Sequence, residues 1–105
     1  MTDLRPIRKA IDNLWKDIRI FDDASLVNEI AAFETFKEFL VARIGNVCTG
    51  SVIETLSTGS DHLKACSIAT LALRHAMDIR VNFVTDKELE YAINIMISNE
   101  KLMGL

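Results

Sequence analysis

Proline, cysteine and long apolar runs are scarce in this chain of 105 residues. It contains one proline and two cysteines, Cys48 and Cys66, which do not form a Cys-x-x-Cys pair. A disulfide framework is therefore not expected, and the two thiols are predicted to be reduced and buried. No apolar run approaches the roughly 18 residues of a membrane-spanning helix, and the charged N-terminal stretch lacks the apolar core of a signal peptide. We therefore expect a cytoplasmic protein that does not contact a membrane.

Motifs that carry chemistry are also missing. Its two histidines, His62 and His75, would lie about 20 Å apart on one helix, so they cannot share a metal within one subunit. The adjacent residues Ser60, Asp61 and His62 contain the letters of a catalytic triad, but neighbours on a helix start do not converge in space. The glycines at 45 and 50 have the spacing of a phosphate-binding loop without its Lys-Ser/Thr pair. The sequence therefore predicts no catalytic residue, no metal, no cofactor and no enzymatic activity.

Half of the residues are apolar, which is enough to build a core, and the length indicates one domain over residues 1–105. The strongest periodic pattern is a run of apolar residues at spacings of three and four, which predicts a helix from about Asp3 to Arg19 or Phe21. The members of this run are Leu4, Ile7, Ile11, Leu14, Ile18 and Phe21.

Three further long helices are predicted from apolar periodicity and from capping residues. One covers residues 26–44, one runs from Asp61 to about Asp78, and one follows the capping box of Thr85 and Glu88 and ends near Leu102. A second capping-box spacing, Ser51 with Glu54, predicts a short helix over about 52–57. Short connections favour antiparallel neighbours, so we predict an all-α fold, an antiparallel four-helix bundle with this short extra helix between the second and third long helices.

The stretch from Lys64 to Met77, KACSIATLALRHAM, is small or apolar at nearly every position for almost four turns. A helix that is apolar on all sides is usually buried. We therefore expect this stretch to form the central helix of the domain, against which the other helices pack. Cys66 and His75 have no convergent partners along it, so it is interpreted as a scaffold.

Charge is unevenly distributed although the whole chain carries only −3. The first predicted helix has a net charge of +2 and includes Arg8 and Arg19, whereas residues 20–45 carry −3 and include Glu34 and Glu38. Such separation can steer a charged partner toward one face of a protein. Binding of nucleic acid by the basic first helix is the less favoured use, because the net charge is modest and aromatic residues are not interleaved with the basic ones.

The chain also has more large apolar residues than one inner stripe per helix requires. Five of them are predicted to lie outside those stripes, and they are Trp15, Phe39, Tyr91, Ile95 and Leu102. Exposed apolar surface of this kind usually marks an interaction site. We therefore predict a non-enzymatic regulator, adaptor or inhibitor that binds another protein, forms a homodimer, and uses these residues together with Arg8, Arg19, Glu34 and Glu38. Two alternatives stay open, a nucleic-acid-associated regulator and a small-molecule binder with a pocket lined by Met77, Met96 and Phe33.

Overall fold

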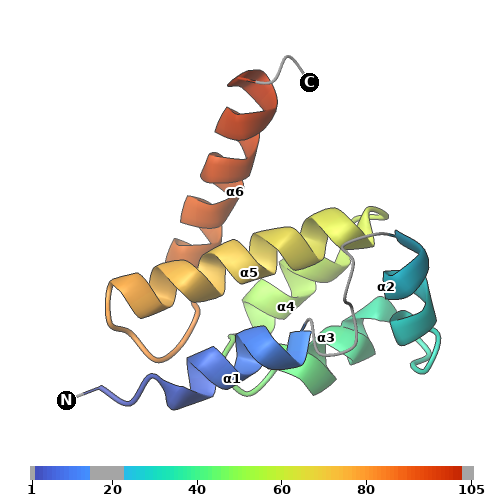
Figure 1. Ribbon diagram of the computed structural model, residues 1–105, viewed down its shortest axis with the longest axis horizontal. Helices are drawn as coiled ribbons and strands as arrows, with labels where there is room; N and C mark the ends of the chain where they lie inside the picture. Colours follow the sequence, from blue (N-terminus) through green and yellow to red (C-terminus); the bar gives the residue numbers. More distant parts are fainter. Residues whose placement is uncertain (1, 15–22, 103–105) are drawn as a thin grey trace.

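A computed structural model describes residues 2–14 and 23–102 of the chain, the side chains of residues 23–25 and 102 excepted. This part of the chain is all-α and contains six helices (Figure 1). They are α1 (Arg5–Leu14), α2 (Asp23–Ile30), α3 (Phe36–Ile44), α4 (Gly50–Ser57), α5 (His62–Asp78) and α6 (Asp86–Leu102). The predicted all-α class is therefore confirmed.

The predicted helix over residues 26–44 is wrong as a single helix, because residues 31–35 separate α2 from α3. Thr35 has an extended backbone (φ −136°, ψ 158°), and its side chain accepts a hydrogen bond from the Glu38 N–H. The Glu38 carboxylate in turn accepts from the Glu34 N–H at 3.2 Å. These bonds satisfy N–H groups at the start of α3, so the polar residues terminate one helix and begin another. The antiparallel four-helix arrangement is accordingly not confirmed.

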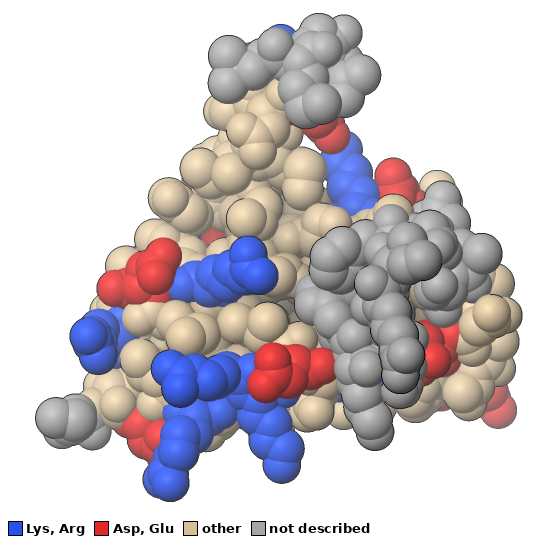
Figure 2. Space-filling view, in the orientation of Figure 1, with Lys and Arg blue, Asp and Glu red and all other residues tan. Residues whose placement is uncertain are grey.

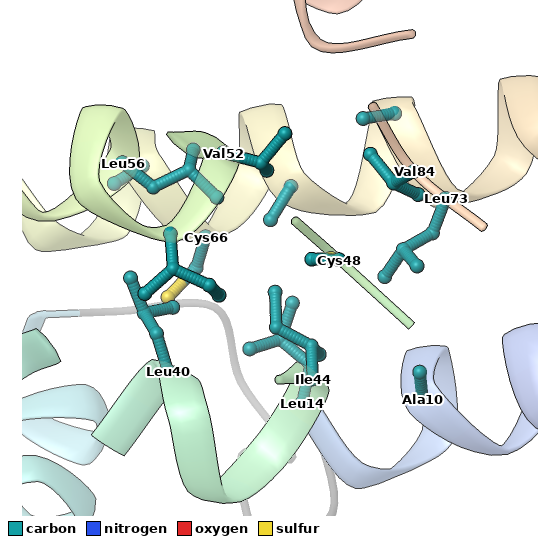
Figure 3. Packing of buried hydrophobic residues seen from close by; sticks show 14 of the residues in the cluster. Ala10, Leu14, Leu40, Ile44, Cys48, Val52, Leu56, Cys66, Leu73 and Val84 are labelled. Atoms are coloured by element: carbon teal, nitrogen blue, oxygen red, sulfur yellow. The ribbon is translucent and has the colours of Figure 1, made fainter. Parts of the chain in front are cut away.

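The central position of α5 agrees with the sequence prediction. α5 contacts α1, α2, α4 and α6, and it buries Ala65, Cys66, Ala69, Thr70, Ala72, Leu73 and Ala76. Its many small residues let these neighbours approach closely. Figure 3 shows the resulting core, in which Leu14 of α1, Leu40 of α3, Val52 of α4 and Cys66 of α5 are gathered. These four side chains are almost completely inaccessible to solvent.

The short helix and the last two helices begin close to their predicted positions. α4 covers the predicted 52–57 and starts slightly earlier, with Thr49 and not Ser51 as the N-cap. α5 is capped by Asp61, whose carboxylate accepts from the Lys64 N–H. α6 begins at the predicted capping box, where Glu88 Oε1 accepts from the Thr85 N–H at 2.8 Å.

The helix α6 leaves the body of the molecule at a steep angle to α5 (Figure 1). Its first half is fixed by buried Leu89 and Ala92 against the core. Its outer half reaches back to α5 through an ion pair between Glu100 and Lys64, 2.6 Å between Oε1 and Nζ. None of the helices in the described ranges is both long enough and apolar enough to cross a membrane.

Candidate functional site

Phe39 is not available as the contact residue that the sequence predicted. Its side chain is 0% exposed and lies in the core. The ring packs edge-on against Phe33, with ring centres 5.7 Å apart, and nearly parallel to Phe36, with ring centres 5.9 Å apart. The guanidinium carbon of Arg43 lies 5.3 Å from the centre of the Phe39 ring. The prediction assumed one continuous helix through residues 31–35, which places Phe39 away from the core. Because α3 begins anew at Phe36, the side of α3 that carries Phe39 faces the core instead.

Tyr91 lies on the surface, as predicted, with 46% of the residue exposed. Its ring stacks on the imidazole of His75 from α5, with ring centres 3.7 Å apart and planes inclined by 11°. Ile95, one turn further along α6, is half-buried. Trp15 and Arg19 lie outside the described residues, and so does the side chain of Leu102, which ends α6.

Sequence reasoning did not select two residues of α5 and its end, His75, which contacts Tyr91, and Ile79. His75 stacks on Tyr91, and Ile79 lies one turn beyond His75, where its N–H donates to the His75 carbonyl at 3.0 Å. Ile79 is 47% exposed. We call His75, Ile79, Tyr91 and Ile95 the α5–α6 face. The spacing of four within each pair was visible in the sequence, but the stack of His75 on Tyr91 depends on how α5 and α6 cross.

Exposed cations form a second surface where α1 runs beside α5 (Figure 1). Figure 2 shows Lys and Arg side chains gathered over α1 and over the adjoining end of α5. We call the four exposed cations Arg8, Lys9, Arg74 and Arg80 the basic face, and none of them has an ion-pair partner within the described residues. Acidic residues of the same two helices, Asp12 and Asp78, are also exposed.

Arg80 occupies an unusual backbone position at the end of α5. Its φ is 62°, the left-handed region that favours glycine. The Arg80 N–H donates to the Met77 carbonyl at 3.1 Å and the Val81 N–H donates to the Ala76 carbonyl at 2.9 Å. This is the hydrogen-bond pattern of a Schellman motif, so the helix ends correctly although an arginine stands where glycine is usual.

The acidic residues chosen as steering groups are exposed but take part in local structure. Glu38 contributes to the cap of α3, and Glu34 supplies the N–H that it accepts. Glu29, the other acid of this region, pairs with Arg43 at 2.9 Å in a half-buried position. The structure therefore shows a structural use for Glu38, while a steering role for Glu34 and Glu38 stays a prediction.

The cysteines and histidines do not assemble a reactive centre in the described residues. Burial raises the pKa of both Cys48 and Cys66 to about 12, which keeps the thiols protonated at neutral pH. His62 is half-buried and stacks on Phe36 with ring centres 4.1 Å apart. No group of three or more His, Cys, Asp or Glu in the described ranges is arranged to hold a metal ion.

Two cavities lie near the start of α5. One, of about 280 Å³, lies among the end of α4, the start of α5 and Ile93 of α6. The other, of about 360 Å³, lies between α2 and the first residues of α5. Neither is lined by Met77, Met96 or Phe33, the residues from which a pocket was predicted.

A comparison with models of known protein families, one with curated proteins and one with solved structures each found no match for this chain.

Proposed function

We propose that this protein is a non-enzymatic helical interaction module that binds another protein through its α5–α6 face and forms a homodimer. It acts as a small regulator, adaptor or inhibitor in the cytoplasm. The observation that carries the proposal is the His75–Tyr91 stack, in which the exposed ring of Tyr91 on α6 lies on the half-buried ring of His75 on α5.

Continuity distinguishes the α5–α6 face from the other exposed apolar residues. Val27 of α2 and Val41 of α3 are more exposed than Tyr91 but are aliphatic, whereas Tyr91 is an exposed aromatic residue whose ring stacks on a residue of a second helix. Isolated apolar residues are normal on protein surfaces, whereas contiguous ones mark interaction sites. Tyrosine is in addition enriched at protein interfaces, because it has an apolar ring and a polar end.

The uneven charge of the surface supports the same proposal. The basic face lies on α1 and around the end of α5, whereas the exposed acids Glu34 and Glu38 lie around the start of α3, so the two groups of charge can orient an approaching partner. Charges at the edge of an interface change the association rate more than the dissociation rate. We therefore expect Arg8→Ala to lower the rate at which the protein associates with its partner. The decrease should be larger at low salt than at high salt.

The experiment is sedimentation equilibrium of the full chain and of the variant Tyr91→Ser. Ser and Tyr have similar helix propensities, so this change removes the ring and leaves α6 intact. We expect the wild type to dimerise and Tyr91→Ser to weaken the dimer by tenfold or more, as for an interface residue that contributes over 1 kcal/mol. Val41→Ser is the matched control, because Val41 is 53% exposed on α3 and lies outside the α5–α6 face. A wild type that stays monomeric at millimolar concentration, or equal effects of both variants, would contradict the homodimer.

The second candidate function is the binding of nucleic acid by the basic face. The observation that favours it is that four cations of α1 and the end of α5 are exposed and unpaired among the described residues. Lysine and arginine side chains that contact phosphates release counterions, so binding weakens as salt is raised. The test is DNA and RNA retention of the variant Arg8→Ala/Lys9→Ala against the control Lys87→Ala/Lys101→Ala, which removes two exposed cations of α6. Retention that is equal in both variants would remove this candidate.

A further inference from the structure

The cavity of about 280 Å³ has an apolar floor and a charged rim. Its floor is formed by Leu56 at the end of α4, by Ile68 of α5 and by Ile93 of α6. Leu56 belongs to the buried core, and the two isoleucines are half-buried against it. Asp61, the N-cap of α5, and Lys64, in its first turn, line the rim. An apolar floor with a few polar groups at the edge is the usual composition of a small-molecule site.

The rim has one negative charge, Asp61, and one positive charge, Lys64, and the positive charge is compensated from outside the cavity by Glu100. The Lys64 ammonium is already paired with Glu100 at 2.6 Å, and the Asp61 carboxylate, which is exposed, accepts the Lys64 backbone N–H at 3.0 Å. The hydrogen bond and the charge of Glu100 raise the pKa of Lys64, and the charge of Asp61 adds to this increase. Lys64 therefore interacts electrostatically with both carboxylates. Asp61, Lys64 and Glu100 together carry a formal charge of −1. A cation would be attracted to the rim and an anion repelled.

The size of the cavity limits its ligand to a small molecule. Sites for drug-sized ligands occupy about 300–1,000 Å³, and this cavity lies just below that range. A short alkyl chain would cover the apolar side chains of the floor, and one ammonium group at its end would reach the rim. A longer or branched ligand would extend into solvent, where it gains no burial.

We propose that this cavity binds a small primary alkylamine, with its ammonium group beside Asp61 and its alkyl chain on Leu56, Ile68 and Ile93. The ammonium donates hydrogen bonds to the lone pairs of Asp61 that the Lys64 N–H does not use. This site is separate from the α5–α6 face, so it stands or falls independently of the proposed homodimer.

The experiment is a titration of the full chain, labelled with ¹⁵N, with hexylamine at pH 7, followed by amide chemical shifts. Hexanoate and hexanol, with the same chain length, are titrated in parallel as anionic and neutral probes. We expect hexylamine to shift the amides of residues 55–68 and of Ile93, with a dissociation constant on the order of 1–10 mM, as befits a ligand of seven non-hydrogen atoms. Hexanol should bind more weakly and hexanoate most weakly.

The decisive variant is Asp61→Asn. Asparagine caps a helix about as well as aspartate, so α5 keeps its start while the rim loses a negative charge. We expect hexylamine to bind about fivefold more weakly and hexanol to bind as before, since an exposed charge pair contributes up to about that factor. The control is Asp86→Asn, because Asp86 is also exposed at a helix start but contacts Ser51 at the other end of α4. It should leave hexylamine binding unchanged.

A second variant, Ile68→Ala, removes apolar surface from the floor of the cavity. It should weaken the binding of hexylamine and of hexanol to a similar degree. The proposal is overturned if hexanoate binds as well as hexylamine, if Asp61→Asn gives the wild-type amine affinity, or if 50 mM hexylamine leaves the amides around the cavity unshifted. Shifts confined to the α5–α6 face or to α2 would overturn it as well.

Discussion

Phe39 of α3 and Tyr91 of α6 differ in their exposure to solvent. Both Phe39 and Tyr91 were predicted to lie outside the inner stripe of their helices. Phe39 is fully buried among Phe33 and Phe36, whereas Tyr91 lies on the surface against the partly buried ring of His75. The difference teaches that the start of a helix, and the neighbours that its axis meets, decide which of its faces is buried.

The same pair of residue types begins both helices, although the hydrogen bonds differ: the Thr35 hydroxyl accepts from the Glu38 N–H, whereas the Glu88 carboxylate accepts from the Thr85 N–H. A threonine followed three residues later by a glutamate stands at the start of α3, Thr35 with Glu38, and at the start of α6, Thr85 with Glu88. At α3 the new start places the following aromatic residues over the core. At α6 the buried residues are Leu89 and Ala92, so that Tyr91 is left at the edge of the crossing with α5. Capping therefore sets where a helix begins, and packing sets what it buries.

Among the variants that test the burial of Phe39 against the exposure of Tyr91, we expect Phe39→Ala to have the largest effect on stability. Removal of a fully buried phenylalanine leaves a cavity and costs about 3–5 kcal/mol in the free energy of unfolding. Urea denaturation measures this loss. The control in the same helix is Val41→Ala, an exposed position where we expect a change within about 0.5 kcal/mol. Similar losses for the two variants would show that α3 does not face the core as described.

The interior can be tested next by raising the pH. Burial raises the pKa of Cys48 and Cys66 from 9.0 to about 12 in the folded chain. Between about pH 9 and pH 12 the unfolded chain has therefore lost thiol protons that the folded chain keeps, and the free energy of unfolding falls as the pH rises. The expected loss at pH 10 is about 1.4 kcal/mol for each thiol.

The measurement is urea denaturation at pH 8 and pH 10. The variant Cys48→Ala/Cys66→Ala is the control, because it lacks both thiols and keeps every other titrating group. Its stability should fall less between the two pH values than that of the wild type. An equal fall in both proteins would show that the thiols are not buried in the core.

The smallest effect on stability is expected from Tyr91→Ser. The change removes an exposed ring and its stack with His75, and aromatic pairs of this kind contribute about 0.5–1.5 kcal/mol. Because Tyr91 is half exposed, we expect a loss of about 0.5 kcal/mol, far below that of Phe39→Ala. A double-mutant cycle with His75→Ala isolates the stack. A loss of about 3 kcal/mol or more would mean that Tyr91 belongs to the core and is not free to meet a partner.

Local signals predicted much of the fold. The small and apolar stretch of α5, the capping box of α6 and the short helix α4 each depend on residues within a few positions of one another. The start of α3 was equally local. Thr35 and Glu38 have the capping-box spacing. The apolar residues before and after them continue with helical periodicity, so the sequence pattern predicted one helix where the structure has two.

What the sequence by itself determined is the all-α class, the central helix α5 and the approximate starts of α4, α5 and α6, because capping bonds and apolar periodicity act over one or two turns. Tertiary structure decided the rest. The burial of Phe39, the stack of His75 on Tyr91 and the cavity between Leu56 and Ile93 join residues from different helices. Their positions follow from how the helices cross, and the crossing is set by the shapes of all the packed side chains together.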